Sequence, residues 1–216
     1  MDIMALSLTD EQETFISKAL EGYNILVDAC IGSGKTTAIQ ILCNTLPEAK
    51  NILYLTYNKL LKLDAKSRIR NINATVTNYH GFAYNILKQA GVTTGISDLI
   101  QVFNKVHPPI PKYDVLILDE YQDLEQELAE MLEYIKSVCP HLQIIAVGDM
   151  EQKIYDKTTL DVPPFINEFL GEHLSLEFTR CFRLSAPLAE RLGRIWHKTI
   201  IGVNDSCNVA HMNEEE

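Results

Sequence analysis

Short, almost wholly apolar runs alternate along the chain with longer stretches in which apolar residues recur at helical spacing. Six of these runs predict strands, at residues 24–29, 51–57, 74–77, 114–120, 142–149 and 174–178. Several are apolar at consecutive positions, as expected of strands that helices cover on both faces of a sheet. The pattern therefore predicts an α/β fold of three layers, with helices on either side of a mostly parallel sheet.

The stretches between these runs have the amphipathic spacing of helices. Thr9 and Gln12 form a capping box, Pro140 follows a helix end, and Pro187 stands at a helix start. The predicted helices span residues 9–20, 35–46, 59–69, 82–90, 96–106, 126–139 and 187–200. Beyond residue 201 the pattern fades. We therefore expect a single domain over residues 1–201 and a flexible acidic tail over residues 202–216.

Composition excludes several classes of protein. The chain has 216 residues, 46% of them hydrophobic and 22% charged, as in ordinary globular proteins. Its five cysteines form no C-x-x-C pair and its six histidines have no metal-binding spacing, so we expect neither a disulfide framework nor a transition-metal site. No apolar run approaches the roughly 18–20 residues of a membrane helix, and residues 1–12 contain no Lys or Arg. We expect a cytoplasmic or nuclear protein that is not secreted and has no membrane partner.

The most informative segment joins the first predicted strand to the next helix, where residues 29–37 read ACIGSGKTT. Glycines let the backbone curl so that several N–H groups converge on phosphate oxygens, at the positive end of a helix dipole. Lys35 would reach the β- and γ-phosphates and Thr36 would ligate Mg²⁺, which predicts a phosphate-binding loop for ATP. An incidental glycine-rich turn is a weaker alternative. So is a dinucleotide-binding turn, which would leave Lys35 and Thr36 unexplained.

Two carboxylates end the predicted strand at residues 114–120. Four apolar residues precede Asp119 and Glu120, which places both acids at the edge where parallel sheets hold ligands. We expect Asp119 to hold Mg²⁺, directly or through water, and Glu120 to polarise the attacking water. Gln152 follows the next strand and is a candidate for sensing the γ-phosphate. A solvated turn for the acids and a capped turn for Gln152 are the simpler alternatives.

The order of these motifs resembles that of the UvrD/Rep-type superfamily 1 DNA helicases, over residues 8 to about 185. Residues 8–12 (LTDEQ) resemble the family's glutamine motif, residues 29–36 its Walker A motif and residues 119–123 (DEYQD) its Walker B motif. Residues 147–155 resemble the motif that links the γ-phosphate to DNA, and residues 180–183 (RCFR) the motif whose aromatic ring stacks on adenine. The resemblance implies a RecA-like P-loop NTPase, the first of two motor domains, which binds ATP and Mg²⁺.

The resemblance also implies roles for individual residues. Gln12 would read the adenine edge, a use that competes with its capping role, and Arg183 would meet the γ-phosphate. The catalytic candidates are Lys35, Glu120, Gln152 and Arg183. The candidates for binding ATP are Gln12, Ala29, Gly32, Ser33, Gly34, Lys35, Thr36, Thr37 and Phe182, and those for binding Mg²⁺ are Thr36 and Asp119.

Residues 55–59 (LTYNK) and 78–82 (NYHGF) resemble the family's contacts with single-stranded DNA. The DNA-binding candidates are Tyr57, Asn58, Lys59, Tyr79, His80 and Tyr155, with Phe82 beside them as a ring that is more often a core residue. Lys59, Lys62, Lys66, Arg68 and Arg70 form a basic cluster, which a solvated helix face would also explain. The net charge of 19 − 29 = −10 predicts modest DNA affinity that falls steeply with salt.

The sequence departs from the family's pattern at several points. After Tyr155 the family continues with glycine, an aromatic residue, arginine and glycine, where this chain has DKTT, and the segment between Phe82 and Asp114 is short for an inserted domain. The arginine that a second motor domain supplies has no counterpart. We therefore expect slow or absent turnover and no unwinding by this chain alone, with a second polypeptide or self-association supplying the other half. A nucleotide-gated binding module is the alternative function. A small-molecule kinase is weaker, because no arginine-rich lid is recognisable.

Overall fold

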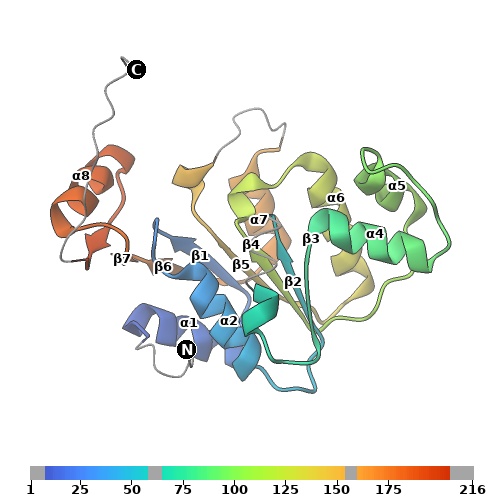
Figure 1. The fold of residues 1–216 in the computed structure, drawn as a ribbon, viewed down its shortest axis with the longest axis horizontal. Helices are drawn as coiled ribbons and strands as arrows, with labels where there is room; N and C mark the ends of the chain where they lie inside the picture. Colours follow the sequence, from blue (N-terminus) through green and yellow to red (C-terminus); the bar gives the residue numbers. More distant parts are fainter. Residues whose placement is uncertain (1–7, 58–64, 154–159, 205–216) are drawn as a thin grey trace, which may run out of the picture.

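The protein is built on one parallel sheet. A computed structural model describes residues 8–57, 65–153 and 160–204 (Figure 1). Its strands are β1 (Ile25–Ala29), β2 (Ile52–Thr56), β3 (Ala74–Asn78), β4 (Val115–Asp119), β5 (Gln143–Gly148) and β6 (Leu174–Phe178). They lie in the order β3-β2-β4-β5-β1-β6, and every pair is parallel. The six predicted strands and the α/β fold are confirmed.

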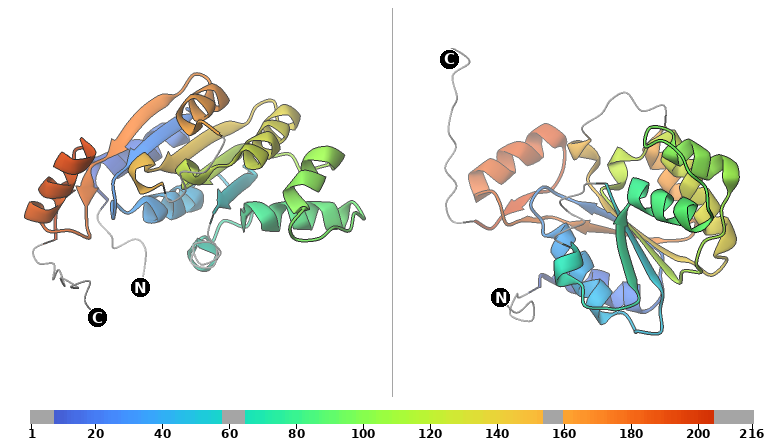
Figure 2. Two further views of the ribbon diagram at one scale, coloured as in Figure 1. Left: turned by 90° about the horizontal axis from the view of Figure 1, so that it is seen from above. Right: turned by 45° about the vertical axis from the view of Figure 1, so that its right-hand side comes forward.

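Helices cover both faces of this sheet (Figure 2). On one face lie α1 (Asp10–Leu20) and α2 (Lys35–Thr45). On the other lie α4 (Tyr79–Gln89), α5 (Leu99–Val106), α6 (Gln126–Val138) and α7 (Val162–Leu170). In β4, Val115 and Ile117 pack toward α1 and α2, whereas Leu116 and Leu118 pack on the opposite face. All four side chains are buried, which explains why the strand sequence is continuously apolar.

Helix ends follow their caps. The predicted capping box is present, because Thr9 Oγ1 accepts a hydrogen bond from Gln12 N and Gln12 Oε1 accepts one from Thr9 N. The α4 helix begins at Tyr79, before the predicted position 82, because the Asn78 side chain accepts a hydrogen bond from Gly81 N. Of the helix predicted over residues 59–69, residues 65–68 are helical, and residues 58–64 lie outside the described part of the chain.

Two elements depart from the predicted pattern. The α7 helix was not predicted, since its two prolines resemble loop residues, yet they occupy the first turn, where no backbone donor is needed. The α5 helix begins at Leu99 rather than at residue 96. In the described ranges, no helix is long and apolar enough to cross a bilayer.

A small C-terminal unit lies beside the sheet, next to β6 (Figure 1). It consists of β7 (Arg180–Cys181), α8 (Ala186–Trp196) and β8 (Ile201–Gly202), with β7 and β8 paired in parallel. The α8 helix ends at Trp196, before the predicted position 200, and Gly202 belongs to a strand rather than to the predicted tail. Cys30, Cys181, Ala189 and Ile200 form a core of their own, which attaches this unit to the end of β1. Residues 205–216 of the predicted tail lie outside the described residues.

Candidate functional site

A loop connects β1 to α2 and curls tightly over its glycines. Gly32 has φ of 67° and Gly34 has φ of 78°, a left-handed conformation that only glycine adopts without strain. A Cβ on Gly32 would lie 2.7 Å from the Cβ of Arg183, so a side chain there would also collide with the C-terminal unit. The curl ends at Lys35, the first residue of α2, so the N–H groups of the loop lie beside those of the helix N-terminus.

Gln12 braces this loop from α1. Its Nε2 donates a hydrogen bond of 3.0 Å to Ser33 O, while its Oε1 accepts the capping bond from Thr9 N. The side chain is 4% exposed. Its carbonyl oxygen and one amide hydrogen are thus engaged within the protein, and the adenine contact predicted for Gln12 stays a prediction. Ala29 likewise lies under the loop, where its side chain is buried in the core and does not line the cavity described below.

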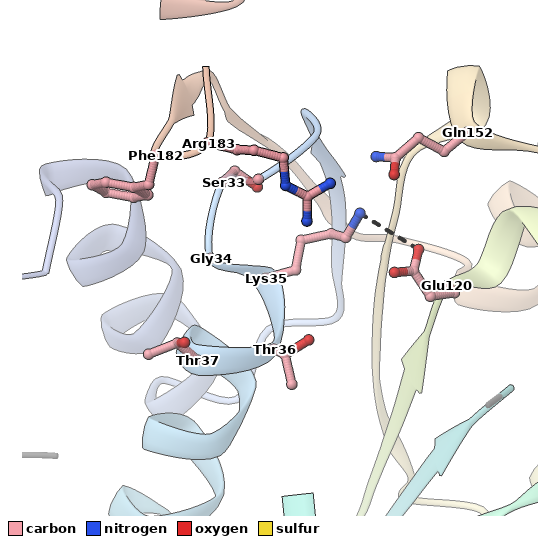
Figure 3. Close-up of a pocket in the computed structure, with 10 residues that line it drawn as sticks. Ser33, Gly34, Lys35, Thr36, Thr37, Glu120, Gln152, Phe182 and Arg183 are labelled. Carbon is pink, nitrogen blue, oxygen red and sulfur yellow. Dashed lines mark ion pairs between the residues drawn. The ribbon is translucent and has the colours of Figure 1, made fainter. Parts of the chain in front are cut away.

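Lys35 faces Glu120 across the end of β5. Lys35 Nζ lies 3.4 Å from Glu120 Oε2, and the same oxygen accepts a hydrogen bond of 2.8 Å from Gln122 Nε2 (Figure 3). Glu120 has φ of 58° and ψ of 49°, a strained conformation for a residue with a side chain. Its backbone N–H donates to Val147 O, which holds the strained turn against β5. Strain of this kind concentrates at functional sites.

Asp119 is wholly buried at the end of β4, beside this ion pair. The Tyr54 hydroxyl donates a hydrogen bond of 2.7 Å to Asp119 Oδ2. Among the described residues, no donor reaches Asp119 Oδ1. Burial, followed by the charge of Glu120, raises the pKa of the Asp119 carboxyl to about 7. A buried carboxylate oxygen that the protein leaves unpaired fits a hard divalent cation such as Mg²⁺, which takes oxygen ligands.

Thr36 and Thr37 follow Lys35 in the first turn of α2 and point in different directions. Figure 3 shows Thr36 directed toward the side of the site that holds Glu120, and Thr37 directed away from it. Thr36 and Asp119 therefore fit the predicted pair of Mg²⁺ ligands. Ser33 Oγ is a further buried polar atom of the loop with no hydrogen-bond partner in the described part of the chain.

These elements enclose a cavity of about 540 Å³. The residues that line it are Gly32, Ser33, Gly34, Lys35, Thr36, Thr37, Glu120, Gln152, Phe182 and Arg183. Arg183 reaches over Lys35 from the C-terminal unit, and Phe182 lies at one side of the loop, where its ring is 48% exposed (Figure 3). Phe182 N donates to Gly32 O at 2.9 Å, which fixes this segment to the loop. Two cations and a helix N-terminus are groups that can bind a polyanion.

Gln152 approaches the cavity from the opposite side, held by Asp149. Gln152 Nε2 donates a hydrogen bond of 2.5 Å to Oδ2 of Asp149, a wholly buried carboxylate. Asp149 N in turn donates to Gln122 Oε1 at 3.0 Å, which links the segment after β5 to the segment after β4. Gln122 and Asp149 belong to the motifs noted in the sequence, but their supporting roles were not predicted. Tyr54 was missed as well, because it looks like a core residue of β2.

The predicted DNA contacts do not converge in the same way. Tyr57, at the end of β2, is half-buried, with its hydroxyl 3.4 Å from Glu125 Oε1, and His80 is exposed in the first turn of α4. Tyr79 is 2% exposed and packs in the core, where its ring meets Tyr57 edge-on at 6.4 Å. The prediction that Tyr79 touches DNA is therefore wrong for this structure, since α4 packs its first residue inward.

The remaining DNA candidates are only partly described. Asn58, Lys59 and Tyr155 lie outside the described residues, as does Lys62 of the basic cluster. Lys66, Arg68 and Arg70 are exposed, and Phe82 is a core residue at 2% exposure.

Comparisons with known proteins agree with this geometry. A family profile described as an AAA domain matches residues 12–158. The Pif1 helicase from Candida albicans matches in structure with a TM-score of 0.58 at 16% identity, over 89% of this chain and 44% of that chain. The Pif1 helicase from Bacteroides in complex with ADP-AlF3 and ssDNA matches with a TM-score of 0.54 at 16% identity, over 88% of this chain and 46% of that chain.

Unliganded Pif1 from Bacteroides sp matches in the same way, with a TM-score of 0.52 at 16% identity, over 88% of this chain and 45% of that chain. The chain thus spans a little under half the length of these helicases. No curated protein sequence matches it. The likeness confirms the predicted RecA-like α/β fold, while assignment to the UvrD/Rep-type superfamily 1 helicases stays a prediction. Because the profile covers more than half of the sequence, the chain belongs to the AAA domain family.

Proposed function

We propose that these residues form an ATP-binding, Mg²⁺-dependent motor domain of the superfamily 1 helicase type that acts on single-stranded DNA. The observation that carries the proposal is the convergence of Lys35, Glu120 and Arg183 on one cavity beside a glycine loop. These groups come from three distant parts of the chain, and a solvated turn would not require them to meet.

The cavity has the charges that a triphosphate needs. Backbone N–H groups of the loop and the N-terminus of α2 would face the phosphates, and Lys35 and Arg183 add two cations. The exposed ring of Phe182 supplies a flat apolar surface beside the loop, suited to a purine. ATP thus fits the cavity, because its phosphates match the cations and N–H groups and its adenine ring can stack on Phe182.

Thr36 and Asp119 would hold the Mg²⁺ ion that accompanies ATP. The ion would neutralise charge on the β- and γ-phosphate oxygens. Asp119 Oδ1 is available for this role because Tyr54 occupies only the other oxygen of the carboxylate. A bound cation also favours the ionised form of Asp119, which burial alone disfavours.

Glu120 is placed to act on water at the γ-phosphate. It now pairs with Lys35, and an incoming phosphate competes for that lysine because hydrogen bonds between charged groups are strong. The carboxylate released from Lys35 can then accept a proton from the attacking water. Gln152 faces the same space and can orient that water or sense the γ-phosphate (Figure 3).

Turnover by these residues alone should be slow. An arginine supplied across an interface contributes roughly 10³–10⁵ in rate in phosphoryl-transfer enzymes of this kind. We propose that a second lobe, from a second polypeptide or from self-association, provides that arginine. Unwinding requires both lobes, so no unwinding is expected from one.

The DNA part of the proposal depends on the ends of β2 and β3. Tyr57 and His80 lie at this edge, with Asn58, Lys59 and Tyr155 as further proposed contacts. Arg70 is exposed but precedes β3, and its backbone N–H donates to Asn44 at the far end of α2, so it belongs to the opposite edge. A matched Pif1 structure contains ssDNA. Aromatic and basic side chains at one edge are the usual elements of a single-strand groove.

The test is ATP hydrolysis by the purified protein with Mg²⁺, with and without single-stranded DNA. We expect slow hydrolysis that DNA accelerates and that Glu120→Gln abolishes while ATP still binds. Glu127→Gln, on the exposed part of α6, serves as the matched control. Tight ATP binding without turnover under any nucleic acid would instead favour the nucleotide-gated binding module.

A further inference from the structure

A lysine from the C-terminal unit reaches into the edge of the sheet beside the phosphate loop. Lys198 follows α8, and its ammonium donates to Oδ1 of Asp28 in β1 at 2.5 Å and to Oδ1 of Asp149 at 2.9 Å. The lysine side chain is 13% exposed and that of Asp149 is 0% exposed. Burial lowers the pKa of Lys198, but the two carboxylates outweigh it and raise the pKa overall, so the group stays a cation.

The backbone around Lys198 is shaped to bring it there. His197 adopts φ of 51°, a left-handed conformation that reverses the chain at the end of α8. A Cβ on Gly193 would lie 2.6 Å from Lys198 O. The chain that follows α8 can therefore pass this close to the helix only because residue 193 is glycine. Lys198 N donates to Gly193 O at 3.0 Å. A surface lysine would need none of these features.

Asp149 connects Lys198 to the nucleotide cavity. Its Oδ1 accepts from Lys198, and its Oδ2 accepts from Gln152 Nε2 at 2.5 Å. Asp149 Oδ1 also accepts the backbone N–H of Glu151 at 3.2 Å, so the buried carboxylate has Lys198 and Glu151 on one oxygen, Gln152 on the other, and little freedom to turn. The amide of Gln152 is therefore oriented by a carboxylate that Lys198 and the Glu151 backbone hold together, and Lys198 is the one charged group that contacts it among the described residues.

We infer that Lys198 is a positioning residue that, through Asp149, aims Gln152 at the γ-phosphate position of the nucleotide cavity. The inference rests on the proposed function, because it takes ATP as the occupant of that cavity. It also has a mechanical consequence. The C-terminal unit that carries Lys198 begins next to Phe182 and Arg183, so a shift of this unit changes both sides of the cavity together.

A double-substitution cycle on the full chain tests the inference. Dissociation constants for ATP and for ADP, each with Mg²⁺, are measured by displacement of a fluorescent nucleotide. If Gln152 senses the γ-phosphate, Gln152→Ala lowers the preference for ATP over ADP about tenfold. Lys198→Met should lower it by a similar factor with ADP affinity nearly unchanged, and the double variant should lose no more than either single one. Lys198→Arg, which keeps the charge, should retain most of the preference.

Controls separate this role from a merely structural one. Arg194→Met removes an exposed cation that pairs with Glu190 on the same helix, and it should leave the ATP preference unchanged. If Lys198→Met does not fold, Lys198→Gln, which keeps a donor of similar size, replaces it in the cycle. An unchanged preference in folded Lys198→Met, or in Lys198→Gln where that variant replaces it, overturns the inference, as do losses that multiply in the double variant or a wild type without any preference. A wild type that binds neither nucleotide contradicts the proposed function itself.

Discussion

Two regions on the same edge of the sheet are built in different ways. At the ends of β1, β4 and β5, charged side chains face a cavity, and Asp119 is buried with one oxygen that accepts no hydrogen bond from a described residue. At the ends of β2 and β3, aromatic side chains dominate, and Tyr79 and Phe82 are wholly engaged in the core. The first region leaves a buried carboxylate oxygen without a hydrogen-bond partner among the described residues, whereas the unpaired buried atoms of the second, Thr56 Oγ1 and the Tyr79 hydroxyl, are uncharged and belong to packed side chains.

This difference indicates where a ligand belongs. A buried charge without a protein partner is unfavourable on its own and becomes favourable when a ligand pairs with it. A packed ring is already stabilised and gains little from a further partner. Substitutions at the nucleotide end should therefore change ligand binding more than they weaken folding, and substitutions of buried rings at the β2–β3 edge should do the reverse.

The largest effect is expected at Asp119, in the absence of nucleotide and metal. Its pKa is about 7 in the folded protein and 3.8 for the unperturbed group, so between these values the folded state binds more protons than the unfolded state. Stability therefore falls as the pH rises through this window, by about 2–4 kcal/mol. Asparagine has no charge to bury. Asp119→Asn should be more stable than wild type by about that amount at pH 8, with a gap that narrows toward pH 4.

Urea unfolding at several pH values measures this gap. Asp98→Asn, at an exposed position before α5, is the matched control and should show no pH-dependent gain. A stability difference that is the same at pH 5 and pH 8 would show that Asp119 is not held in a charge-disfavouring site. The Asp119 variant should also lose Mg²⁺-dependent nucleotide binding, although it folds more stably.

The next effect is the loss of nucleotide affinity in Lys35→Ala. A hydrogen bond between charged groups contributes about 1.5–3 kcal/mol, which corresponds to roughly 10- to 100-fold in the dissociation constant for ATP. Folding should change little, because Glu120 keeps its hydrogen bond from Gln122. Lys66→Ala, at an exposed position, is the control. An unchanged dissociation constant for ATP in Lys35→Ala would contradict the assignment of the whole cavity.

The sequence predicted the nucleotide end closely because its geometry depends on local residue types. All ten residues that line the cavity were candidates. The loop followed from its own residues, since glycines at positions 32 and 34 require a curled backbone, whereas Phe182 and Arg183 were candidates only through the resemblance to the helicase family. The six strands were equally predictable from their apolar runs. The strand order was not, because it depends on which runs pair in space rather than on any one of them.

Residues that act through distant partners escaped prediction. Tyr54 resembles any core residue of an apolar strand until its hydroxyl is seen to meet Asp119, 65 positions along the chain. Lys198 resembles a surface lysine of the helix predicted over residues 187–200, and only the turn at His197 brings it to Asp149. Tyr79 shows the opposite error, because whether a ring at a helix start points outward depends on what the helix packs against.

A smaller effect should distinguish Tyr54 as a support of the metal site. Tyr54→Phe removes the hydroxyl that holds Asp119 Oδ2, so the carboxylate loses its fixed orientation. Loss of such a supporting hydrogen bond weakens metal affinity by about tenfold. The measurement is Mn²⁺ binding in the presence of ATP, followed by electron paramagnetic resonance. Tyr113→Phe, on the opposite face of the sheet, should have no effect. Equal Mn²⁺ affinity in the two variants would remove Tyr54 from the site.

The smallest effect is expected at the β2–β3 edge, and it tests whether that edge binds nucleic acid at all. One stacked base contributes roughly 1–3 kcal/mol, and because Tyr57 is half-buried we expect the lower limit, about fivefold in affinity for single-stranded DNA. Tyr57→Ala should show this loss at low salt, measured by fluorescence anisotropy with a labelled oligonucleotide. Tyr79→Phe should leave affinity unchanged, because within the described residues its hydroxyl has no hydrogen-bond partner and its ring lies in the core. If Tyr57→Ala binds DNA as well as wild type does, the rings of this edge serve folding alone, and any DNA contact must come from elsewhere on the molecule.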